Sequence, residues 1–537
     1  MKYKVCILAA GVGTRMFPLT KKINKSLLPV DFKAVLSHII EKFDPAVEIV
    51  IAVGYLKETI IDYLECAYSD RTFTIVEVDR YTGEGSGPGY SLMQCRRYLD
   101  SPFIFFASDT LVLEDIPPPS ENWLGVSAVE DSEPYCTAEI FNNRVVGLED
   151  KTINDNENAF IGLAGINAYQ VFFDALEKNN EVKAGEFQVS NGFSTLIGCE
   201  LVPRYFTWHD TGNIEGYTKA NEAMSTSDVD FDFSKQDEFL YFVGNNVIKF
   251  FADEAIIKNR HERALILGDL CPRISVLKKN FYSYNMVGGE VLYDVIDDGI
   301  MEKLLAWLDE NLWVKARLNR SQLRAFKLAC SDFYYKKTNK RLKQYHERHS
   351  LIDEASSING VNVPSIKELF NSIDWGDLSN GTPSNFHGDL QFDNVLLKND
   401  GNFLLLDWRQ DFSGLVDYGD QYYDFAKLNG GMIVSYKLIK QGQFSYLKDE
   451  KGNVKIEHNT PEALVTGRDK FISFLNSKGI DMCKVNILTS LIYLNMSPMH
   501  NEPFDHFIYN LGKLNLYRSV IESGKLPSSE KMSSLKS

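Results

Sequence analysis

The sequence predicts an α/β protein of two domains, residues 1–228 and 229–537. Over about the first 225 residues, short apolar runs alternate with helical patterns, which favours a mainly parallel sheet. From about residue 239 the pattern changes to two apolar strands around a turn, followed by a helix and later by long helical stretches. A chain of 537 residues also exceeds what one hydrophobic core ordinarily supports, so two or more domains are expected.

In the first domain, residues 4–9, 47–53 and 103–107 are apolar runs that read as buried strands. Residues 34–43 and 56–66 have helical periodicity and lie between them. In parallel sheets, ligands bind at the carboxyl ends of the strands. The residues that directly follow these runs are therefore the candidate site residues.

The polar, acidic segment 225–232 marks the expected domain boundary. Beyond it, residues 239–251 form a hairpin pattern around Gly-Asn-Asn, and a helix is expected over about 253–267. The stretches 300–350 and 462–525 are mostly helical in pattern. The polar tail from about residue 526 is expected to fray.

The formal net charge is −16, which disfavours non-specific binding to nucleic acid or anionic lipid. The eight cysteines are scattered and form no C-x-x-C pair, so neither a zinc site nor a disulfide framework is indicated. No stretch approaches the roughly 18 apolar residues of a membrane span. A cytoplasmic protein with reduced thiols is expected; a homo-oligomer stays open.

A glycine-rich turn directly follows the first strand, where residues 8–16 read LAAGVGTRM. Glycines there let backbone N–H groups approach a polyphosphate, and Arg15 adds a fixed cation. Met16 replaces the third glycine of a dinucleotide fingerprint, and no Walker lysine follows at the required spacing. The expected nucleotide-binding residues of this turn are Leu8, Ala10, Gly11, Gly13 and Thr14.

Together with Pro18-Leu19-Thr20 and the later run from Lys25 to Val30 (KSLLPV), this segment resembles the sugar-phosphate nucleotidyltransferase family, including its choline-phosphate cytidylyltransferase branch. The resemblance covers about residues 1–225 and implies a Rossmann-like domain. It implies that Arg15 contacts the triphosphate and Lys25 the attacking phosphate as catalytic residues. Ser26 stands where the family has proline.

Two aspartates are the expected Mg²⁺ ligands of this site. Asp109 ends an apolar strand, and Asp210, in the run WHDTGN, resembles the family's second metal-binding aspartate. The alternative for an aspartate after a strand is a turn or a helix N-cap.

The loop GEGSGPG at residues 83–89 lies where the family contacts the base, so Gly83 and Gly85 are expected to bind nucleotide. The resemblance also implies substrate binding by Glu149, Lys151 and Gly165. The loop departs from the usual Gly-Thr-Ala run, which leaves CTP and UTP open, and an ordinary turn and core strand stay open for these elements.

A second signature, HGDLQFDN at residues 387–394, is a phosphotransfer loop. Its aspartate must reach a substrate hydroxyl, and the asparagine five residues later must reach a magnesium ion. Asp407 follows the strand 403–406, and a hairpin would return this second carboxylate to the same metal.

This loop resembles the aminoglycoside phosphotransferase and choline kinase family, over about residues 238–520. The resemblance implies a bilobal protein-kinase-like α+β fold, Asp389 as catalytic base, Asn394 and Asp407 as Mg²⁺ ligands, and ATP as donor. A protein kinase is disfavoured because no Ala-Pro-Glu element follows Asp407. Further expected contacts are Lys249 paired with Glu262, Met286 in the connector that grips adenine, and Tyr422 in the acceptor pocket.

The two signatures together indicate a bifunctional enzyme. It would phosphorylate a small alcohol, an amino alcohol such as choline or ethanolamine, or a sugar with ATP, and transfer a nucleotidyl group from CTP or UTP to the product. That product would be an activated donor for a capsule, a lipopolysaccharide or a lipid head group. The alternatives are a nucleotide-binding sensor or scaffold with one inactive domain, and two domains that act on different substrates.

Overall fold

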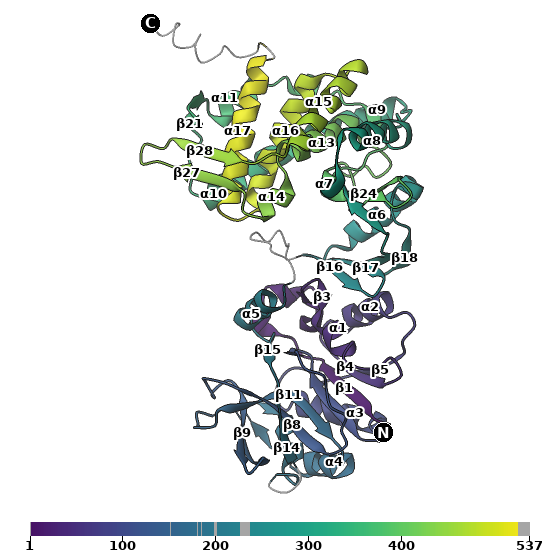
Figure 1. The fold of residues 1–537 in the computed structure, drawn as a ribbon, viewed down its shortest axis with the longest axis vertical. Helices are drawn as coiled ribbons and strands as arrows, with labels where there is room; N and C mark the ends of the chain where they lie inside the picture. Colours follow the sequence, from purple (N-terminus) through teal and green to yellow (C-terminus); the bar gives the residue numbers. More distant parts are fainter. Residues whose placement is uncertain are drawn as a thin grey trace. The chain divides into compact units, whose positions relative to one another are not determined.

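The computed structural model describes residues 2–150, 152–179, 181–183, 185–197, 201–225, 237–522 and 524. The chain divides into two compact units (Figure 1). The first contains residues 1–227, 234–254 and 275–284, and the second contains residues 228–233, 255–274 and 285–537. The expected polar boundary segment at 225–232, apart from Ser225, and the tail from 526 lie outside the described residues.

The first unit is built on a nine-stranded sheet whose main path runs β10-β9-β11-β6-β1-β4-β5. The central strands β1, β4, β5 and β6 are parallel to their neighbours in this set, as the sequence predicts. The remaining strands β8–β11 pair antiparallel, and β14 joins β8 in parallel. The bounds are β1 (Lys4–Ala9), β4 (Glu48–Val53), β5 (Phe73–Glu77), β6 (Phe103–Ala107), β8 (Asn122–Ala128), β9 (Cys136–Phe141), β10 (Arg144–Asp150), β11 (Asn158–Ile166) and β14 (Leu201–Tyr205).

Alternate residues of the strands bury into two separate apolar layers, because successive side chains of a strand point to opposite faces. Val5, Ile7 and Ala9 join the layer under α1 and α2, whereas Cys6 joins the layer under α3 and α4. The helices are α1 (Val35–Ile40), α2 (Lys57–Ala67), α3 (Pro88–Cys95), α4 (Tyr169–Lys178) and α5 (Ile214–Met224). The short strands are β2 (Pro29–Val30), β3 (Lys33–Ala34), β7 (Thr110–Val112), β12 (Val182–Lys183), β13 (Glu186–Phe187) and β15 (Trp208–Asp210).

The hairpin expected at 239–251 forms part of a second sheet, ordered β16-β17-β19-β18, that packs into the first unit. Tyr241 is fully buried there, and its hydroxyl donates to the carbonyl of Leu27 at 2.8 Å. Its ring meets Tyr63 of α2 edge-on at 5.1 Å. The strands are β16 (Glu238–Val243), β17 (Asn246–Phe251), β18 (Ile274–Leu277) and β19 (Phe281–Asn285). A single boundary at residue 228 therefore does not describe how these strands pack.

The second unit is mainly helical around a core contributed by α9, α10, α13, α16 and α17. Its helices are α6 (Glu254–Leu267), α7 (Leu292–Val295), α8 (Asp298–Asn311), α9 (Arg320–Ser331), α10 (Lys337–Arg348), α11 (Ile366–Asn371), α12 (Trp375–Leu378), α13 (Gln421–Ile433), α14 (Tyr436–Lys440), α15 (Glu462–Ser477), α16 (Met482–Met496) and α17 (Phe504–Glu522). A π-helical turn, Asp332–Lys336, joins α9 to α10. The helices expected at 253–267, 300–350 and 462–525 are confirmed.

Small sheets complete the second unit. In the three-stranded sheet β20-β24-β25, the loop at 387–394 leads directly into β24, and Asp407 follows β25. The four-stranded sheet β22-β21-β28-β27 lies against α17. The bounds are β20 (Gly289–Val291), β21 (Ser356–Ile358), β22 (Val361–Val363), β23 (Pro383–Ser384), β24 (Val395–Lys398), β25 (Phe403–Leu405), β26 (Gly419–Asp420), β27 (Phe444–Lys448) and β28 (Val454–His458).

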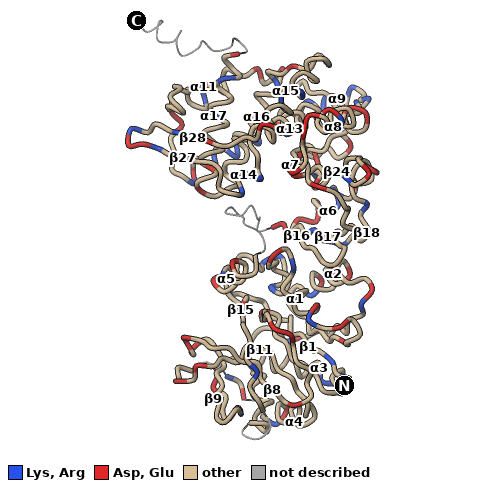
Figure 2. Tube along the Cα trace, in the orientation of Figure 1, with Lys and Arg blue, Asp and Glu red and all other residues tan. Residues whose placement is uncertain are grey.

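Charged residues of both signs are interspersed along the trace of each unit (Figure 2). Among the described residues, no helix is long and apolar enough to cross a membrane.

Candidate active sites

The glycine-rich turn of the first unit brings Lys25 against the end of β1. Gly13 has φ 65°, a left-handed conformation that favours glycine. A Cβ at Gly13 would lie 3.1 Å from Cβ of Lys25, so a side chain there would also press on the lysine stem. The glycine is thus required both by the backbone and by the close approach of Lys25.

Asn24, which sequence reasoning missed, fixes the position of Lys25. Its side-chain nitrogen donates to the carbonyls of Ala9 at 3.1 Å and Tyr55 at 2.8 Å, and its oxygen accepts from the backbone N–H of Ser26 at 3.0 Å. Asn24 is fully buried, so these bonds tie the lysine turn to the end of β1 and to the loop after β4. Only the combined placement of three segments reveals this role.

Lys25 reaches Asp109, which follows β6, with 2.5 Å between Nζ and Oδ2. Asp210 ends β15, whose antiparallel partner β7 begins beside Asp109 and pairs Thr110 with Asp210. A Cβ on Gly212 would lie 2.9 Å from Oδ1 of Asp210, 3.0 Å from Oδ2 of Asp109 and 3.3 Å from the guanidinium of Arg15. The two carboxylates and the two cations therefore converge on one small space.

The two carboxyl groups are held in different electrostatic states. Burial by itself would raise the pKa of Asp109, but the positive charges of Lys25 and Arg15 outweigh it and lower that pKa. Burial, followed by the negative charge of Asp109, raises the pKa of Asp210. A pair of carboxylates that repel each other beside a polar cleft is a donor set that suits Mg²⁺, which prefers hard oxygen ligands.

These residues line a cleft of about 1040 Å³. The cleft contains the expected residues Leu8, Ala10, Gly11, Gly13, Thr14, Arg15, Lys25, Gly83, Asp109 and Asp210. Gly85 is not in its wall; its N–H donates to the carbonyl of Gly185 at 3.0 Å. Most of the residues expected to bind nucleotide in this part of the chain thus line one cleft, and their binding role stays a prediction.

Two of the expected substrate-binding residues, Glu149 and Gly165, do not line the cleft. Glu149 is exposed and accepts a hydrogen bond from Thr152 at 3.4 Å. Gly165 packs beneath Trp123, because any Cβ on Gly165 would overlap the indole ring. Lys151 lies outside the described residues. The structure thus gives Gly165 a packing role and does not place Glu149 in the wall of the cleft.

Three residues that the sequence did not single out line the cleft instead: Gly162, Tyr135 and Trp208. Gly162 has φ 73° and lies against Ala107, at the end of β6. The rings of Tyr135 and Trp208 meet edge-on at 5.2 Å beside Asp210. Trp208 lies two residues before Asp210, and this closeness in sequence was the signal that could have indicated its place in the cleft.

In the second unit, His387 anchors the loop that carries Asp389. Its Nε2 bonds to the carbonyl of Leu406 at 2.8 Å, and its Nδ1 accepts from the backbone N–H of Asp389 at 3.2 Å. Burial lowers the pKa of His387 to about 4, so the ring is neutral with its proton on Nε2. The histidine thereby joins the loop to the strand that leads to Asp407.

Asp424, on the first turns of α13, also holds this loop through hydrogen bonds to its backbone. Its two oxygens accept from the backbone N–H groups of His387 and Gly388, each at 2.7 Å. Burial raises the pKa of Asp424 to about 7, against these two donors and the nearby Arg263. Arg263, from α6, is fully buried and donates to the carbonyls of Phe386, Arg409 and Val416.

Asp389 is paired with Lys427 of α13, with 2.6 Å between Nζ and Oδ1. Burial by itself would raise the pKa of Asp389, but the ammonium of Lys427 outweighs it and lowers that pKa. Asp407 acts in the opposite sense, so the two carboxylates are close enough to interact. Lys427 lies 38 residues after Asp389, and the sequence alone did not indicate it.

The other two expected metal ligands lie on the same loops. The side-chain nitrogen of Asn394 donates to the carbonyl of Asp389 at 2.8 Å, which leaves its oxygen as the group for a cation. Asp407 has φ 55° and pairs with Arg260 of α6 at 2.6 Å. A non-glycine residue in this conformation is costly and is typical of functional sites. The indole N–H of the next residue, Trp408, donates to the carbonyl of Arg260 at 2.8 Å.

The remaining expected residues of this site are dispersed. Lys249 is buried on β17, in the first unit. Glu262, in the second unit, is 45% exposed and lies 3.9 Å from Lys258. Their pairing stays a prediction. Met286 is 45% exposed between β19 and β20. The ring of Tyr422 stacks under Lys484, with 4.7 Å from Nζ to the ring centroid.

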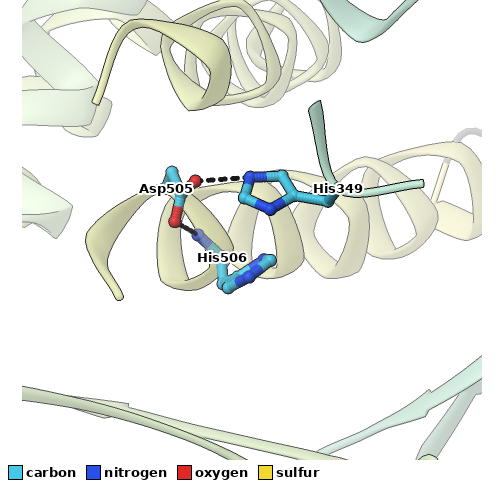
Figure 3. Close-up of side chains that lie close together, drawn as sticks. All are labelled: His349, Asp505 and His506. Atoms are coloured by element: carbon cyan, nitrogen blue, oxygen red, sulfur yellow. Dashed lines mark hydrogen bonds and ion pairs between the residues drawn. The ribbon is translucent and has the colours of Figure 1, made fainter. Parts of the chain in front are cut away.

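A separate cluster joins the end of α10 to α17 (Figure 3). Ligand atoms of His349, Asp505 and His506 lie within 4.8 Å of one another. Asp505 is fully buried and accepts from Nε2 of His349 at 2.7 Å and from the backbone N–H of His506 at 2.6 Å. Nδ1 of His506 bonds to Tyr345 at 2.6 Å. The polar atoms of the cluster thus already have hydrogen-bond partners, and the cluster serves as a hydrogen-bonded link between the two helices.

Residues 5–115 match the family model of the MobA-like NTP transferase domain. Residues 5–115 therefore carry an NTP transferase domain, and the α/β fold with a mainly parallel central sheet that was expected for this part of the sequence is confirmed.

Among characterised proteins, the chain is similar to the bifunctional protein GlmU of Methanococcus vannielii, with 30% identity over 230 residues, 40% of this chain and 53% of that protein. It is also similar to a UTP–glucose-1-phosphate uridylyltransferase of Pseudomonas aeruginosa, with 27% identity over 270 residues, 40% of this chain and 94% of that protein. The chain thus spans about half the length of its GlmU relative.

Among solved structures, the CTP:phosphocholine cytidylyltransferase of Streptococcus pneumoniae has 20% identity and a TM-score of 0.37, covering 42% of this chain and 100% of that one. A UDP-glucose pyrophosphorylase bound to UDP-glucose has 20% identity and a TM-score of 0.36, covering 42% of this chain and 98% of that one.

Proposed function

We propose that the first unit transfers a nucleotidyl group from CTP or UTP to a small phosphate monoester. The observation that carries this proposal is the convergence of Arg15, Lys25, Asp109 and Asp210 on the cleft at the end of β1. Two polyanions repel each other, so their reaction requires cations fixed in advance on both.

In this reaction an oxygen of the phosphate monoester attacks the α-phosphorus of the nucleotide, and the bond from that phosphorus to pyrophosphate breaks. Arg15 stabilises the departing phosphates, and Lys25 leaves Asp109 to neutralise the attacking phosphate. Asp109 and Asp210 would hold Mg²⁺, which supplies further charge neutralisation on the nucleotide. Backbone N–H groups of Gly11 and Gly13 cradle the triphosphate.

For the second unit we propose a kinase that phosphorylates a small alcohol with ATP. The hydroxyl oxygen of the acceptor attacks the γ-phosphorus, the bond to ADP breaks, and the hydroxyl proton passes to Asp389. Lys427 keeps Asp389 ionised before the reaction, because its ammonium lowers the pKa of that carboxyl. Asn394 and Asp407 would hold Mg²⁺, and Arg260 orients Asp407.

The two reactions form a natural sequence, since the kinase product is a phosphate monoester and the transferase consumes one. The final product would be a nucleotide-activated alcohol or sugar of the kind used to decorate surface glycans or lipids. CTP is favoured over UTP by the likeness to the choline-phosphate branch, an argument by analogy.

Selective inactivation tests the proposal. Purified full-length protein receives ATP, CTP or UTP, Mg²⁺ and a panel of alcohols, and ADP and pyrophosphate are measured separately. Lys25→Ala is expected to lower pyrophosphate release by about 10²–10³ and to leave ADP formation intact, whereas Asp389→Asn does the reverse. The exposed residues Lys22 and Asp400 provide matched controls, as Lys22→Ala and Asp400→Asn.

Three outcomes are informative beyond these. A folded variant that loses both activities contradicts the two-site proposal. No turnover with any alcohol favours a sensor or scaffold. A kinase product that the Asp389→Asn variant fails to nucleotidylate means that the two units act on different molecules.

A further inference from the structure

One aromatic ring beside the second site carries two cations. The ammonium of Lys337 lies 4.0 Å from the ring centroid of Phe333, and the guanidinium carbon of Arg409 lies 4.9 Å from the same centroid. Phe333 is buried and packs against Tyr423 of α13 at 4.8 Å. The backbone N–H of Arg409 donates to the carbonyl of His387 at 2.9 Å, so this ring and its cations adjoin the loop of Asp389.

Two more cations belong to the same place. Arg341 lies one turn after Lys337 on α10, so both side chains share one face of that helix. Lys427 lies one turn after Tyr423 on α13 and contacts Asp389 directly. The π-helical turn that precedes Lys337 is a feature often found at functional sites. We call Lys337, Arg341, Arg409 and Lys427 the cation cluster.

The cation cluster is not balanced by acidic residues of the chain. Within the described part of the chain, Asp389 is the one carboxylate paired with any of its members, and Lys337, Arg341 and Arg409 form no ion pair. Nearby Asp332 is already paired with Lys336 at 2.6 Å.

Burial, followed by the charges of Arg409 and Lys427, lowers the pKa of Lys337 well below its ordinary value. Burial and Arg409 also lower the pKa of Arg341. Like charges gathered beside a buried ring repel one another, and an anion would relieve that repulsion.

We propose that the cation cluster binds an anionic group of the kinase acceptor, so that the acceptor is an alcohol bearing a carboxylate or a phosphate. This inference rests on the proposed kinase function of the same site. An anionic acceptor would take the place of the amino alcohol considered from the sequence. Tyr422, the residue expected in the acceptor pocket, already lies under the ammonium of Lys484.

The position of the cluster assigns it to the acceptor rather than to ATP. Asp407, one of the two expected metal ligands, is served by a different cation, Arg260 of α6. The cluster gathers around Asp389, the residue that takes the proton of the acceptor. The anionic group would then hold the hydroxyl toward Asp389, with Phe333 keeping the two flanking cations in place.

Binding of inorganic phosphate to the full-length protein tests the site directly. Isothermal titration is made with and without saturating Mg·ADP, on the native protein and on Lys337→Met combined with Arg341→Met. Losing charge-assisted contacts weakens phosphate binding about tenfold or more. Lys343→Met is the matched control, because Lys343 lies on the same helix with its side chain 77% exposed.

Stability distinguishes an anion site from a purely structural role of these residues. If the cation cluster is an anion site, the double variant without added anion is expected to unfold at a higher urea concentration than the native protein, because it removes like charges. Phosphate is expected to raise the urea midpoint of the native protein and not that of the variant. Equal phosphate binding by both proteins, or complete displacement of phosphate by Mg·ADP, overturns the inference.

Turnover separates this inference from the kinase proposal. ADP formation is compared for glycerate, glycerol 3-phosphate, glycerol and choline, which share a hydroxyl and differ in charge. Preference for glycerate or glycerol 3-phosphate identifies the carboxylate or the phosphate as the anionic group. Faster Asp389-dependent turnover of glycerol or choline leaves the kinase standing and overturns the anionic acceptor. If no alcohol is phosphorylated but phosphate binding depends on Lys337 and Arg341, the kinase proposal falls and the binding site remains.

Discussion

Replacing Tyr241 tests whether the hairpin β16–β17 belongs to the core of the first unit. The hydroxyl of Tyr241 donates to the carbonyl of Leu27 at 2.8 Å, and both residues are fully buried. Tyr241→Phe leaves that carbonyl without this donor, which costs about 1–3 kcal/mol. Tyr241→Ala also removes the ring that packs on Tyr63, and a cavity of this kind costs about 3–5 kcal/mol.

Hydrogen exchange measured by mass spectrometry is the suitable assay, since it reports each unit separately. The amides of β1 and β4 lie in the central sheet of the first unit. Their exchange is expected to accelerate about tenfold or more in Tyr241→Phe and further in Tyr241→Ala, because 1.4 kcal/mol corresponds to a factor of ten.

The control is Tyr205→Phe, because the side chain of Tyr205 is 61% exposed and its loss is expected to change stability by less than about 0.5 kcal/mol. If Tyr241→Phe and Tyr205→Phe leave β1 and β4 equally protected, the hairpin does not support this unit and the reasoning fails.

Three further predictions follow from the same structure. A fragment ending at residue 228 lacks the core residues Tyr241, Val243, Ile248, Phe250 and Phe281. Burial of each of these side chains contributes about 1.5–3 kcal/mol to stability, so circular dichroism is expected to show that the fragment is unfolded or molten. A native-like melt would contradict the assigned core. His387 is neutral in the folded protein, with its pKa lowered from 6.5 to about 4, so stability is lost as pH falls from about 6.5 to about 4, by about 3 kcal/mol in total. Asp424, whose pKa is raised to about 7, has the opposite effect: it lowers the stability as pH rises toward 7. The contribution of His387 is therefore taken from the difference between the urea midpoints of the native protein and His387→Gln at each pH. Parallel curves of midpoint against pH would refute this contribution. Gly13→Ala places an alanine in the left-handed conformation against Lys25, which costs about 1 kcal/mol or more of stability. This variant is expected to depress pyrophosphate release and to leave ADP formation unchanged. The control is Gly401→Ala, because Gly401 also has positive φ but has open space around it.

The sequence predicted the order of the elements and most of one cleft. The alternation of strands and helices indicated the parallel sheet, and the glycine turn after the first strand indicated the residues that line the end of β1. These features depend on short stretches of chain, because backbone conformation and the placement of a loop after a strand are largely local properties. The MobA-like match over residues 5–115 confirms an NTP transferase domain in this part of the chain, whereas the roles of the cleft residues stay predictions.

The same reasoning misplaced Gly165 and missed Asn24 and Lys427. Gly165 fits a family pattern, but its missing side chain accommodates Trp123. Asn24 and Lys427 carry no local signal, since an isolated polar residue on a turn or helix is ordinary. Their roles arise from hydrogen bonds and ion pairs made with distant segments.

The amino-acid order by itself determined which chemical groups stand at the ends of strands, and hence that each half carries carboxylates there. Tertiary structure decided which charges meet: Arg260 pairs with Asp407 across 147 residues, and Lys25 with Asp109 across 84. It also placed β16 and β17 against α2 rather than leaving them to the second unit. The reason is that local sequence sets backbone conformation, whereas Coulomb interactions and burial depend on how remote segments pack.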